Sequence, residues 1–505
     1  MTPETAVATA VLLPLLGAVG IALTGRWPNL RESVTVVTAL AVFGVVLSLV
    51  PGVLAGDRPG LTVLDVMPGV ALAFEVEPLG MLYGLVATGL WIPTALYAIG
   101  YCRAHGEENQ TRFFVCFALA IFAALGIAFA RNLFTLFLFY EALTLSTYPL
   151  VTHYGNDEAR AAGRTYLGIL LTTSILFLLL AIIWTWKLTG TLEFSPGGIL
   201  AGRVDGPLVA VLLGLYVFGT GKAALMPFHR WLPAAMVAPT PVSALLHAVA
   251  IVKAGVFTVV KVIVYIFGID FLSETGASIW LMYAASFTLL AASLIAFTKD
   301  NLKARLAYST ISQLAYIVLG GALATATGVF GSGMHIAMHA MGKITLFFCA
   351  GAIFVASHKK NVSEMDGLGR TMPFTLAAFF VGSMSIIGLP PTGGAWSKWY
   401  LALGAAEGHH LVFVGVLMVS SLLSIGYLMP VVGRAFFLAP SSDPVENSKS
   451  EGDGLGLPVK GFWSKIHEAP LLCVAPLCAT AAGCVVLFFY APDIFGLLQG
   501  MRLGG

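Results

Sequence analysis

Residues 215–255 read LYVFGTGKAALMPFHRWLPAAMVAPTPVSALLHAVAIVKAG, and this stretch decides the fold. It is almost wholly apolar, yet it contains basic side chains and prolines: Lys222, His229, Arg230, His247, Lys253, Pro227, Pro233, Pro239 and Pro241. Charged groups and helix breaks are costly inside an apolar membrane segment, so together they predict a polar pathway. We expect the rest of the chain to be a membrane scaffold that aligns this stretch with Glu141 and Lys398.

The composition is typical of an integral membrane protein. Of the 505 residues, 58% are hydrophobic and 10% are charged, whereas soluble proteins carry about 25% charged residues. The repeated apolar segments are about 20 residues long, which suits transmembrane helices rather than barrel strands. The predicted fold class is therefore all-α and membrane-embedded.

Charge and cysteine usage exclude several other classes. The net charge is +2, and the basic residues sit in short loops, so no nucleic-acid partner is expected. The six cysteines are scattered without interleaved histidine or carboxylate, which disfavours a disulfide framework or an iron–sulfur site. The N-terminus lacks a charged n-region and a small-residue cleavage site, so we expect a retained first helix rather than a signal peptide.

About fourteen apolar segments are long enough to span a bilayer. They lie near residues 5–23, 33–54, 78–100, 112–130, 132–153, 163–187, 208–239, 241–267, 276–297, 303–325, 327–357, 373–406, 410–438 and 468–490. Two of them contain internal prolines: Pro227 and Pro233 in the seventh, Pro390 and Pro391 in the twelfth. We expect both to be discontinuous helices.

Lysine and arginine are concentrated in one set of alternate loops, which predicts that those loops are cytoplasmic and that both termini face outward. The alternating, valine-rich segment 61–78 predicts a small hairpin on the outer side. The polar, Gly/Pro/Ser-rich stretch 440–467 predicts a flexible cytoplasmic loop followed by a short helix.

The spans suggest an internal repeat. Residues 112–267 and 268–438 each hold five spans, and in each set the fourth is proline-broken and carries a lysine, Lys222 or Lys398. Inverted repeats with sites near mid-membrane are common in transporters. We therefore divide the chain into the N-terminal three helices with the hairpin (1–111), two five-helix repeats, and a cytoplasmic loop with the last helix (439–505).

Glu141 and Lys222 are the first candidate pair. A carboxylate in mid-membrane needs a cation or a water-filled cavity nearby. Lys222 lies beside Gly219 and Gly221, which allow close approach of another helix or of water. A coupled Glu141–Lys222 pair would shift its proton when a third charge approaches. A static ion pair that clamps two helices is the alternative.

The next charges lie on two later spans. Lys253 is deep in its span, Lys261 is expected to extend towards the membrane edge, and His247 is placed to link Lys222 to Lys253 through water. His335 and His339, with Lys343 after them, form one stripe on one helix face. Zinc is disfavoured, because no carboxylate or cysteine joins the histidines and a lysine repels a dication. A proton relay is favoured over a polar helix–helix seam.

Lys398 follows the second break, where freed backbone groups can solvate it; extension of its side chain to an interface is the alternative. The proposed proton-transfer groups are Glu141, Lys222, Lys253 and Lys398, with His247, His335 and His339 as relays. No phosphate loop, nucleophile motif or cofactor fingerprint is present, so we expect no cofactor, no resident metal and no redox site of its own.

These residues identify a resemblance. The strings WLPAAMVAPTPVSALLHAVAIVKAG, FYEALTLSTYPLV and GLPPTGGAWSKW resemble the antiporter-like subunits of respiratory complex I and of the Mrp cation/proton antiporters, across nearly the whole chain. Within that superfamily the chain is most similar to the D-type subunits of Mrp Na⁺/H⁺ antiporters. Met236 stands where some complex I relatives carry histidine, which favours the Mrp-like branch.

The resemblance implies fourteen spans, two inverted five-helix repeats and discontinuous seventh and twelfth helices. It implies that Glu141 and Lys222 handle protons, that Lys253 and the histidines connect the two halves, and that Lys398 is the terminal lysine. It also implies a bacterial or archaeal plasma membrane, other membrane subunits as partners, and protons with Na⁺ or K⁺ as transported ions.

Two alternatives remain open. In the first alternative, the chain moves protons by the same path within complex I or a membrane-bound hydrogenase, driven by electron transfer elsewhere. In the second, which is ranked last, the chain is the membrane component of an inorganic-carbon uptake system. No acidic cluster suited to Na⁺ is visible inside the spans, so sodium is expected to cross elsewhere in the complex.

Overall fold

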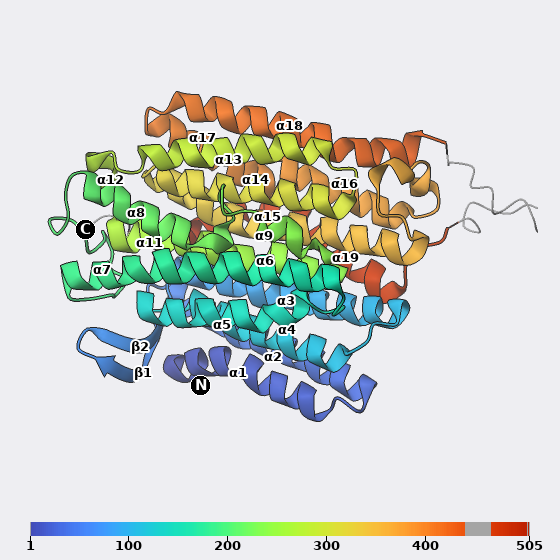
Figure 1. Ribbon diagram of the computed structural model, residues 1–505, viewed down its shortest axis with the longest axis horizontal. Helices are drawn as coiled ribbons and strands as arrows, with labels where there is room; N and C mark the ends of the chain where they lie inside the picture. The colour runs from blue at the N-terminus through green and yellow to red at the C-terminus, as the bar shows by residue number, and fades with distance from the viewer. Residues whose placement is uncertain (1, 440–465, 502, 504–505) are drawn as a thin grey trace, which may run out of the picture.

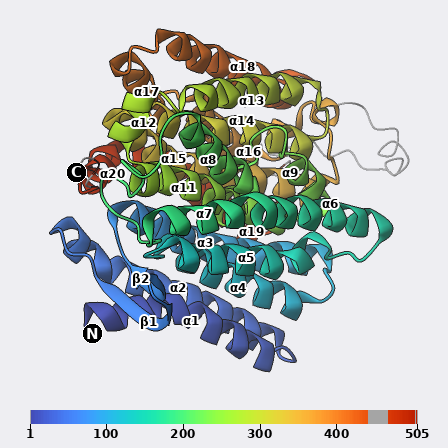
Figure 2. The ribbon, with the colours of Figure 1, turned by 60° about the vertical axis from the view of Figure 1, so that its left-hand side comes forward.

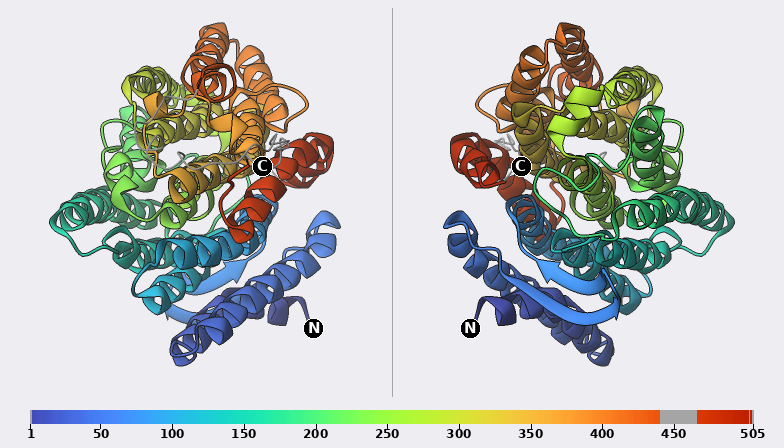
Figure 3. Two further views of the ribbon diagram at one scale, coloured as in Figure 1. Left: turned by 90° about the vertical axis from the view of Figure 1, so that its right-hand side faces the viewer. Right: turned by 90° about the vertical axis from the view of Figure 1, so that its left-hand side faces the viewer.

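The computed structural model describes residues 2–439, 466–501 and 503, and these residues are almost entirely helical (Figure 1). Within them, 11 helices are long and apolar enough to cross a membrane. The helices run side by side along the long axis of the molecule, with α1 and α2 at one edge and α18 at the opposite edge (Figure 1, Figure 3). The predicted all-α membrane fold is confirmed.

The N-terminal part contains two paired helices, a hairpin and three further helices. In order, these are α1 (Pro3–Leu23), α2 (Pro28–Leu54), β1 (Gly60–Met67), β2 (Val70–Glu75), α3 (Pro78–His105), α4 (Gln110–Ala128) and α5 (Leu133–Val151). The strands pair antiparallel, which confirms the predicted hairpin. Glu77 begins α3 by accepting hydrogen bonds from the N–H groups of Leu79 and Gly80, both at 2.8 Å, because the first amides of a helix lack partners within the helix.

The middle part contains the first break. It comprises α6 (Asp157–Thr173), a π-helical turn (Ser174–Leu178), α7 (Leu179–Thr189), α8 (Pro207–Gly219), a 3₁₀ turn (Gly221–Ala223), α9 (Trp231–Ala234), a second 3₁₀ turn (Ala235–Val237), α10 (Thr240–Ala244), a π-helical turn (Leu245–Val249), α11 (Ile251–Val262), a third π-helical turn (Ile263–Phe267) and α12 (Ile269–Thr275). Every residue from 238 to 269 is buried, so this segment is the central pillar of the bundle. Helices inside a bundle can be apolar on all sides, which explains the nearly continuous apolar run.

The last part contains the second break. It comprises α13 (Ile279–Thr298), α14 (Leu302–Ala322), α15 (Ala326–Ser357), 3₁₀ turns at Val362–Glu364 and Leu368–Arg370, α16 (Pro373–Ile387), α17 (Gly394–Glu407), α18 (Leu411–Phe437), α19 (Leu471–Phe489) and α20 (Ala491–Gln499). The expected loop over 440–467 and the short helix after it fall largely on residues 440–465, outside the described residues.

The number of spans stays a prediction. Beyond the 11 apolar helices, α14 is equally long, and the interrupted helices α8 and α16–α17 occupy the positions of the two proline-containing segments. The short helices α12 and α20 were missed. Pro492 and Asp493 open α20, and proline with an acidic residue in a first turn is a typical helix start.

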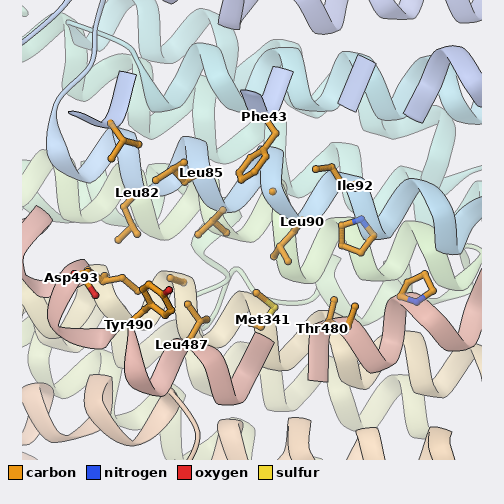
Figure 4. Close-up of a pocket in the computed structure, with 18 of the residues that line it drawn as sticks. Phe43, Leu82, Leu85, Leu90, Ile92, Met341, Thr480, Leu487, Tyr490 and Asp493 are labelled. Carbon is orange, nitrogen blue, oxygen red and sulfur yellow. The ribbon is translucent and has the colours of Figure 1, made fainter. Parts of the chain in front are cut away.

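An apolar groove of about 830 Å³ lies beside α19 (Figure 4). Phe43 of α2, Leu90 of α3, Met341 of α15 and Leu487 of α19 line it. Asp493 lies near one end. None of the predicted proton-transfer or relay residues contributes a side chain to this groove.

Candidate proton-handling site

The first break places Lys222 in the protein interior. Helix α8 ends at Gly219, and Lys222 follows in the 3₁₀ turn with its side chain fully buried. A Cβ on Gly255 of α11 would overlap the backbone of Lys222 and Ala223. The break therefore packs directly against the central pillar, and glycine is required for that approach.

The prolines do not all lie where the helix is interrupted. The non-helical stretch begins at Thr220, seven residues before Pro227. Pro233 lies within the short helix α9 rather than in the interrupted stretch. Pro390 and Pro391 lie between α16 and α17, as expected.

The Lys222 ammonium is held by α5. Its Nζ donates to the carbonyl oxygen of Tyr140 at 2.7 Å and to Thr144 Oγ1 at 2.6 Å. The same Nζ lies 3.1 Å from the centre of the Tyr140 ring, and the hydroxyl of Tyr140 accepts from the Lys222 backbone N–H at 3.1 Å. A carbonyl, a hydroxyl and an aromatic face together replace the water that a buried ammonium loses.

Glu141 does not pair directly with Lys222. No ion pair joins them, and neither carboxylate oxygen has a hydrogen-bond partner among the described residues. Successive helix residues point about 100° apart, so Tyr140 and Thr144 face Lys222 while Glu141 lies on a neighbouring face. That face also carries Leu138 and Leu145, which are 42% and 58% exposed. No direct contact is therefore formed, although Glu141 shares one helix with the residues that hold Lys222, and the coupling of the two groups stays a prediction.

The centre of the site joins α11 to α15. Lys253, fully buried, contacts Nδ1 of His339. The His339 and His335 rings stack with centroids 5.8 Å apart and an interplanar angle of 12°. The predicted histidine stripe therefore faces Lys253 and forms a continuous group with it.

His335 connects this group to α17, which follows the second break. Its Nδ1 lies 2.9 Å from Ser397 Oγ and its Nε2 lies 3.2 Å from Gln313 Oε1. A serine hydroxyl both donates and accepts, and an amide does so through its two ends. These partners can therefore satisfy either a neutral or a protonated imidazole, as a relay requires.

Lys398 ends this line. Its Nζ donates to the carbonyl of Ile387 at 3.0 Å, to Ser421 Oγ at 3.0 Å and to Tyr316 Oη at 3.5 Å. The Tyr316 ring lies 4.6 Å from this ammonium and stacks on His335 at 5.5 Å. Ile387 is the last residue of α16, so its carbonyl is freed by the break. The side chain is held inward by these contacts, against the alternative that it extends to an interface.

His247 is not in contact with either neighbouring lysine. It lies in a π-helical turn, fully buried, with its ring 4.7 Å from that of Phe347. Neither ring nitrogen has a partner among the described residues. The structure thus joins Lys253 to Lys398 but leaves Lys222 separate from Lys253.

Several polar residues of the site were missed. Gln313, Tyr316 and Ser421 contact the line directly. Lys343 donates to Ser309 Oγ at 2.6 Å, on the same helix α14 that carries the Gln313 partner of His335. The available signal was a run of polar residues in one span, Ser309, Thr310, Ser312, Gln313 and Tyr316.

Comparison with known proteins identifies the family. A family model described as NADH:quinone oxidoreductase/Mrp antiporter, TM, matches residues 130–424, which is more than half of the chain. The chain belongs to this family. It is an antiporter-like, proton-translocating, multi-pass membrane component of the Mrp and complex I type.

Relatives fall in both branches of the family. NADH-quinone oxidoreductase subunit N of Desulforudis audaxviator is 33% identical over 433 residues, covering 85% of this chain and 84% of its own. The A/B subunit of a probable K⁺/H⁺ antiporter of Rhizobium meliloti is 32% identical over 466 residues, covering 89% of this chain and 43% of its own. These relatives belong to hetero-oligomeric membrane complexes.

Solved structures show the same fold. One component of the Mrp complex from Dietzia sp. DQ12-45-1b superposes with a TM-score of 0.86 at 23% identity, covering 100% of this chain and 98% of its own. One component of the membrane-bound sulfane sulfur reductase, an archaeal respiratory membrane complex, superposes with a TM-score of 0.84 at 23% identity, covering 99% of this chain and 97% of its own. Both likenesses concern the fold alone.

Proposed function

We propose that this chain is the proton-translocating component of a multi-subunit Na⁺ or K⁺/proton antiporter, equivalent to the D-type subunits of Mrp antiporters, in a bacterial or archaeal plasma membrane. The observation that carries the proposal is the connected group Lys253, His339, His335, Tyr316 and Lys398. Protonatable groups within reach of one another inside an apolar bundle are typical of proton paths.

Lys222 is proposed to act as a second, separate proton site. Two neutral oxygens and an aromatic ring hold its ammonium, so no negatively charged group is in direct contact with it. Glu141 is proposed to influence Lys222 across the width of α5. His247 is proposed to bridge towards Lys253 through water, since both of its ring nitrogens are free of protein partners in the described part of the chain.

The half-exposed face of α5 is proposed to meet another membrane component. An unpaired carboxylate at membrane depth is costly, and Glu141 lies on the same face as the exposed Leu138 and Leu145. A neighbouring chain there would cover these two leucines, whereas both carboxylate oxygens of Glu141 are already buried within this chain. Positive-inside charge bias further supports outward-facing termini and an outward-facing hairpin.

The proposal is tested by cation-driven proton exchange in inverted membrane vesicles. Glu141→Gln and Lys398→Met, each in an assembled complex, are expected to lose at least nine-tenths of the exchange rate. Trp399→Phe, a change of an exposed neighbour of Lys398, is the matched control. Full exchange in either charge variant would refute the proposal.

A second candidate is a proton-pumping component of a complex I-like enzyme. The 84% coverage of a quinone oxidoreductase relative favours it. The proteins that co-purify with this chain discriminate the two: small antiporter components support the first function, and quinone- or hydrogenase-module components support the second.

A further inference from the structure

Helix α11 carries a second buried lysine that the site above does not use. Lys261 is 1% exposed, so its side chain is enclosed by protein, and its extension towards the membrane edge stays a prediction. Its Nζ donates to the carbonyl of Ala130 at 2.9 Å and lies 3.4 Å from Glu77 Oε1. The rings of Phe194 and Phe257 lie 4.7 and 5.3 Å from the ammonium.

The Glu77 carboxylate is the anchor of this cluster. It accepts the backbone N–H groups of Leu79 and Gly80, and the Tyr265 hydroxyl at 3.0 Å, in addition to Lys261. Four donors around one carboxylate hold it in place. Lys261 is therefore the group in this cluster that is free to gain or lose a proton while its partner stays fixed.

A pocket of about 260 Å³ leads from this ion pair to the surface at the hairpin end of the molecule. Arg131, whose side chain is 44% exposed, lies at the rim and pairs with Glu193 at 2.8 Å and with Glu75 at 3.9 Å. Arg58 also lines the pocket and is tied to the carbonyl of Gly500 at 2.7 Å. Burial raises the pKa of Glu75, and the nearby Arg131 partly offsets that rise.

The hairpin, α12 and the C-terminus lie at this same end (Figure 2). Charges of both signs line the pocket, and polar walls of this kind hold water rather than lipid. The pocket therefore brings an aqueous surface to within contact of a lysine that is otherwise enclosed by the bundle.

The same helix leads inward to Lys253. Eight residues separate the two lysines, which is about 12 Å along the helix axis at 1.5 Å per residue. Thr258 lies between them, fully buried, and its hydroxyl has no partner among the described residues. A buried hydroxyl without a protein partner is normally met by water, so hydrogen-bonding capacity is present between the two lysines.

We propose that Lys261, with Glu77 and Tyr265 around it, is a proton port: the position at which protons exchange between the buried lysine–histidine line and the water on the hairpin face. The proposal rests on the proton-translocating function above and adds an entry or exit residue to it. The Lys261 ammonium gives its proton to pocket water, the resulting amine takes a proton from the inner side, and the Glu77 carboxylate is held in place by its other donors throughout.

Lys261→Arg separates a port from a structural clamp. Arginine keeps the positive charge and the pairing with Glu77, but it does not deprotonate in proteins. The port predicts at least a tenfold loss of exchange in both Lys261→Arg and Lys261→Gln, with assembly measured by co-purification. A clamp predicts that Lys261→Arg restores the rate lost in Lys261→Gln, and that result would overturn the proposal.

Thiol accessibility tests the port without relying on transport. Cysteine is introduced at the rim (Glu75→Cys) and beside the ammonium (Phe194→Cys), and intact complexes are treated with a membrane-impermeant cationic methanethiosulfonate in vesicles of both orientations. Both positions are expected to react from the hairpin face only, and the modified Phe194→Cys complex is expected to lose exchange. The unsubstituted complex, with its own buried or half-buried cysteines, is the control.

The two proposals fail in different ways. If Glu75→Cys reacts with the thiol reagent and Phe194→Cys does not, the port is overturned, even if Glu141→Gln abolishes exchange. Full exchange in Glu141→Gln refutes the proposed function, even if Phe194→Cys reacts. If the larger arginine side chain prevents assembly, the thiol result decides the port.

Discussion

The contact between Lys253 and His339 gives the most direct test of the proton line. In the part of the chain that the structure describes, Nδ1 of His339 is the hydrogen-bond partner of the Lys253 ammonium. His339→Gln removes the imidazole, so no ring remains to stack on His335 at 5.8 Å, and the amide that replaces it does not take up and release a proton as an imidazole does.

The size of the effect follows from that contact. A hydrogen bond to a charged group contributes about 1.5–3 kcal/mol, and each 1.36 kcal/mol corresponds to about a tenfold change in rate. If the proton must pass through the charged form of Lys253, exchange at fixed pH is expected to fall about 10- to 150-fold in His339→Gln.

The assay is cation-induced proton release from acid-loaded inverted vesicles, followed with a pH-sensitive dye and normalised to the amount of assembled complex. His410→Gln is the matched control, because His410 is half-buried before α18 and packs on Phe413. More than half of the normal rate in an assembled His339→Gln complex would refute a path through this histidine.

Three further outcomes are expected. Thr144→Val removes one of the two oxygens that hold the Lys222 ammonium and should lower exchange about tenfold; an unchanged rate would show that the Tyr140 carbonyl and ring suffice. Gly255→Ala should destabilise the complex by about 1–3 kcal/mol through overpacking, whereas Gly214→Ala, with no neighbour nearer than 3.7 Å, should leave the melting temperature unchanged. Hydrogen bonds from Ser363 lower the pKa of Asp300, so this contact stabilises the fold above the unfolded pKa of about 3.9 and loses that contribution as the pH falls through the lower folded value. Melting curves of Asp300→Asn should therefore show a deficit at about pH 7 that shrinks as the pH is lowered below about 3.9, and a deficit that does not change with pH would contradict the linkage.

The helical membrane fold and both helix breaks could be predicted from the sequence. Apolar length indicated the spans, and internal prolines indicated the breaks. The start of the first break was misjudged, because Thr220 and the flanking glycines end α8 well before Pro227. Proline marks where a helix cannot continue, but tertiary packing against Gly255 decides where this one stops.

The residues that contact the buried charged side chains could not be predicted from the sequence. Helix α5 has no distinct polar face, so periodicity could not reveal whether Glu141 or its neighbours Tyr140 and Thr144 face Lys222. The contacts of Lys398 with Ser421 and Tyr316 join residues 23 and 82 positions apart. Such pairings depend on how the helices are rotated in the bundle, which a single sequence does not specify.

The enclosed pillar at residues 238–269 has a consequence for biogenesis. None of its side chains reaches the lipid in the finished molecule, yet it leaves the ribosome before α14 and α15, which later cover it. At a helix centre, a lysine costs about 2.5–3.5 kcal/mol to insert into lipid, and this segment holds Lys253 and Lys261. Its insertion therefore needs shelter, either retention by the translocation machinery or early docking on the preceding helices, until the second half of the chain is made.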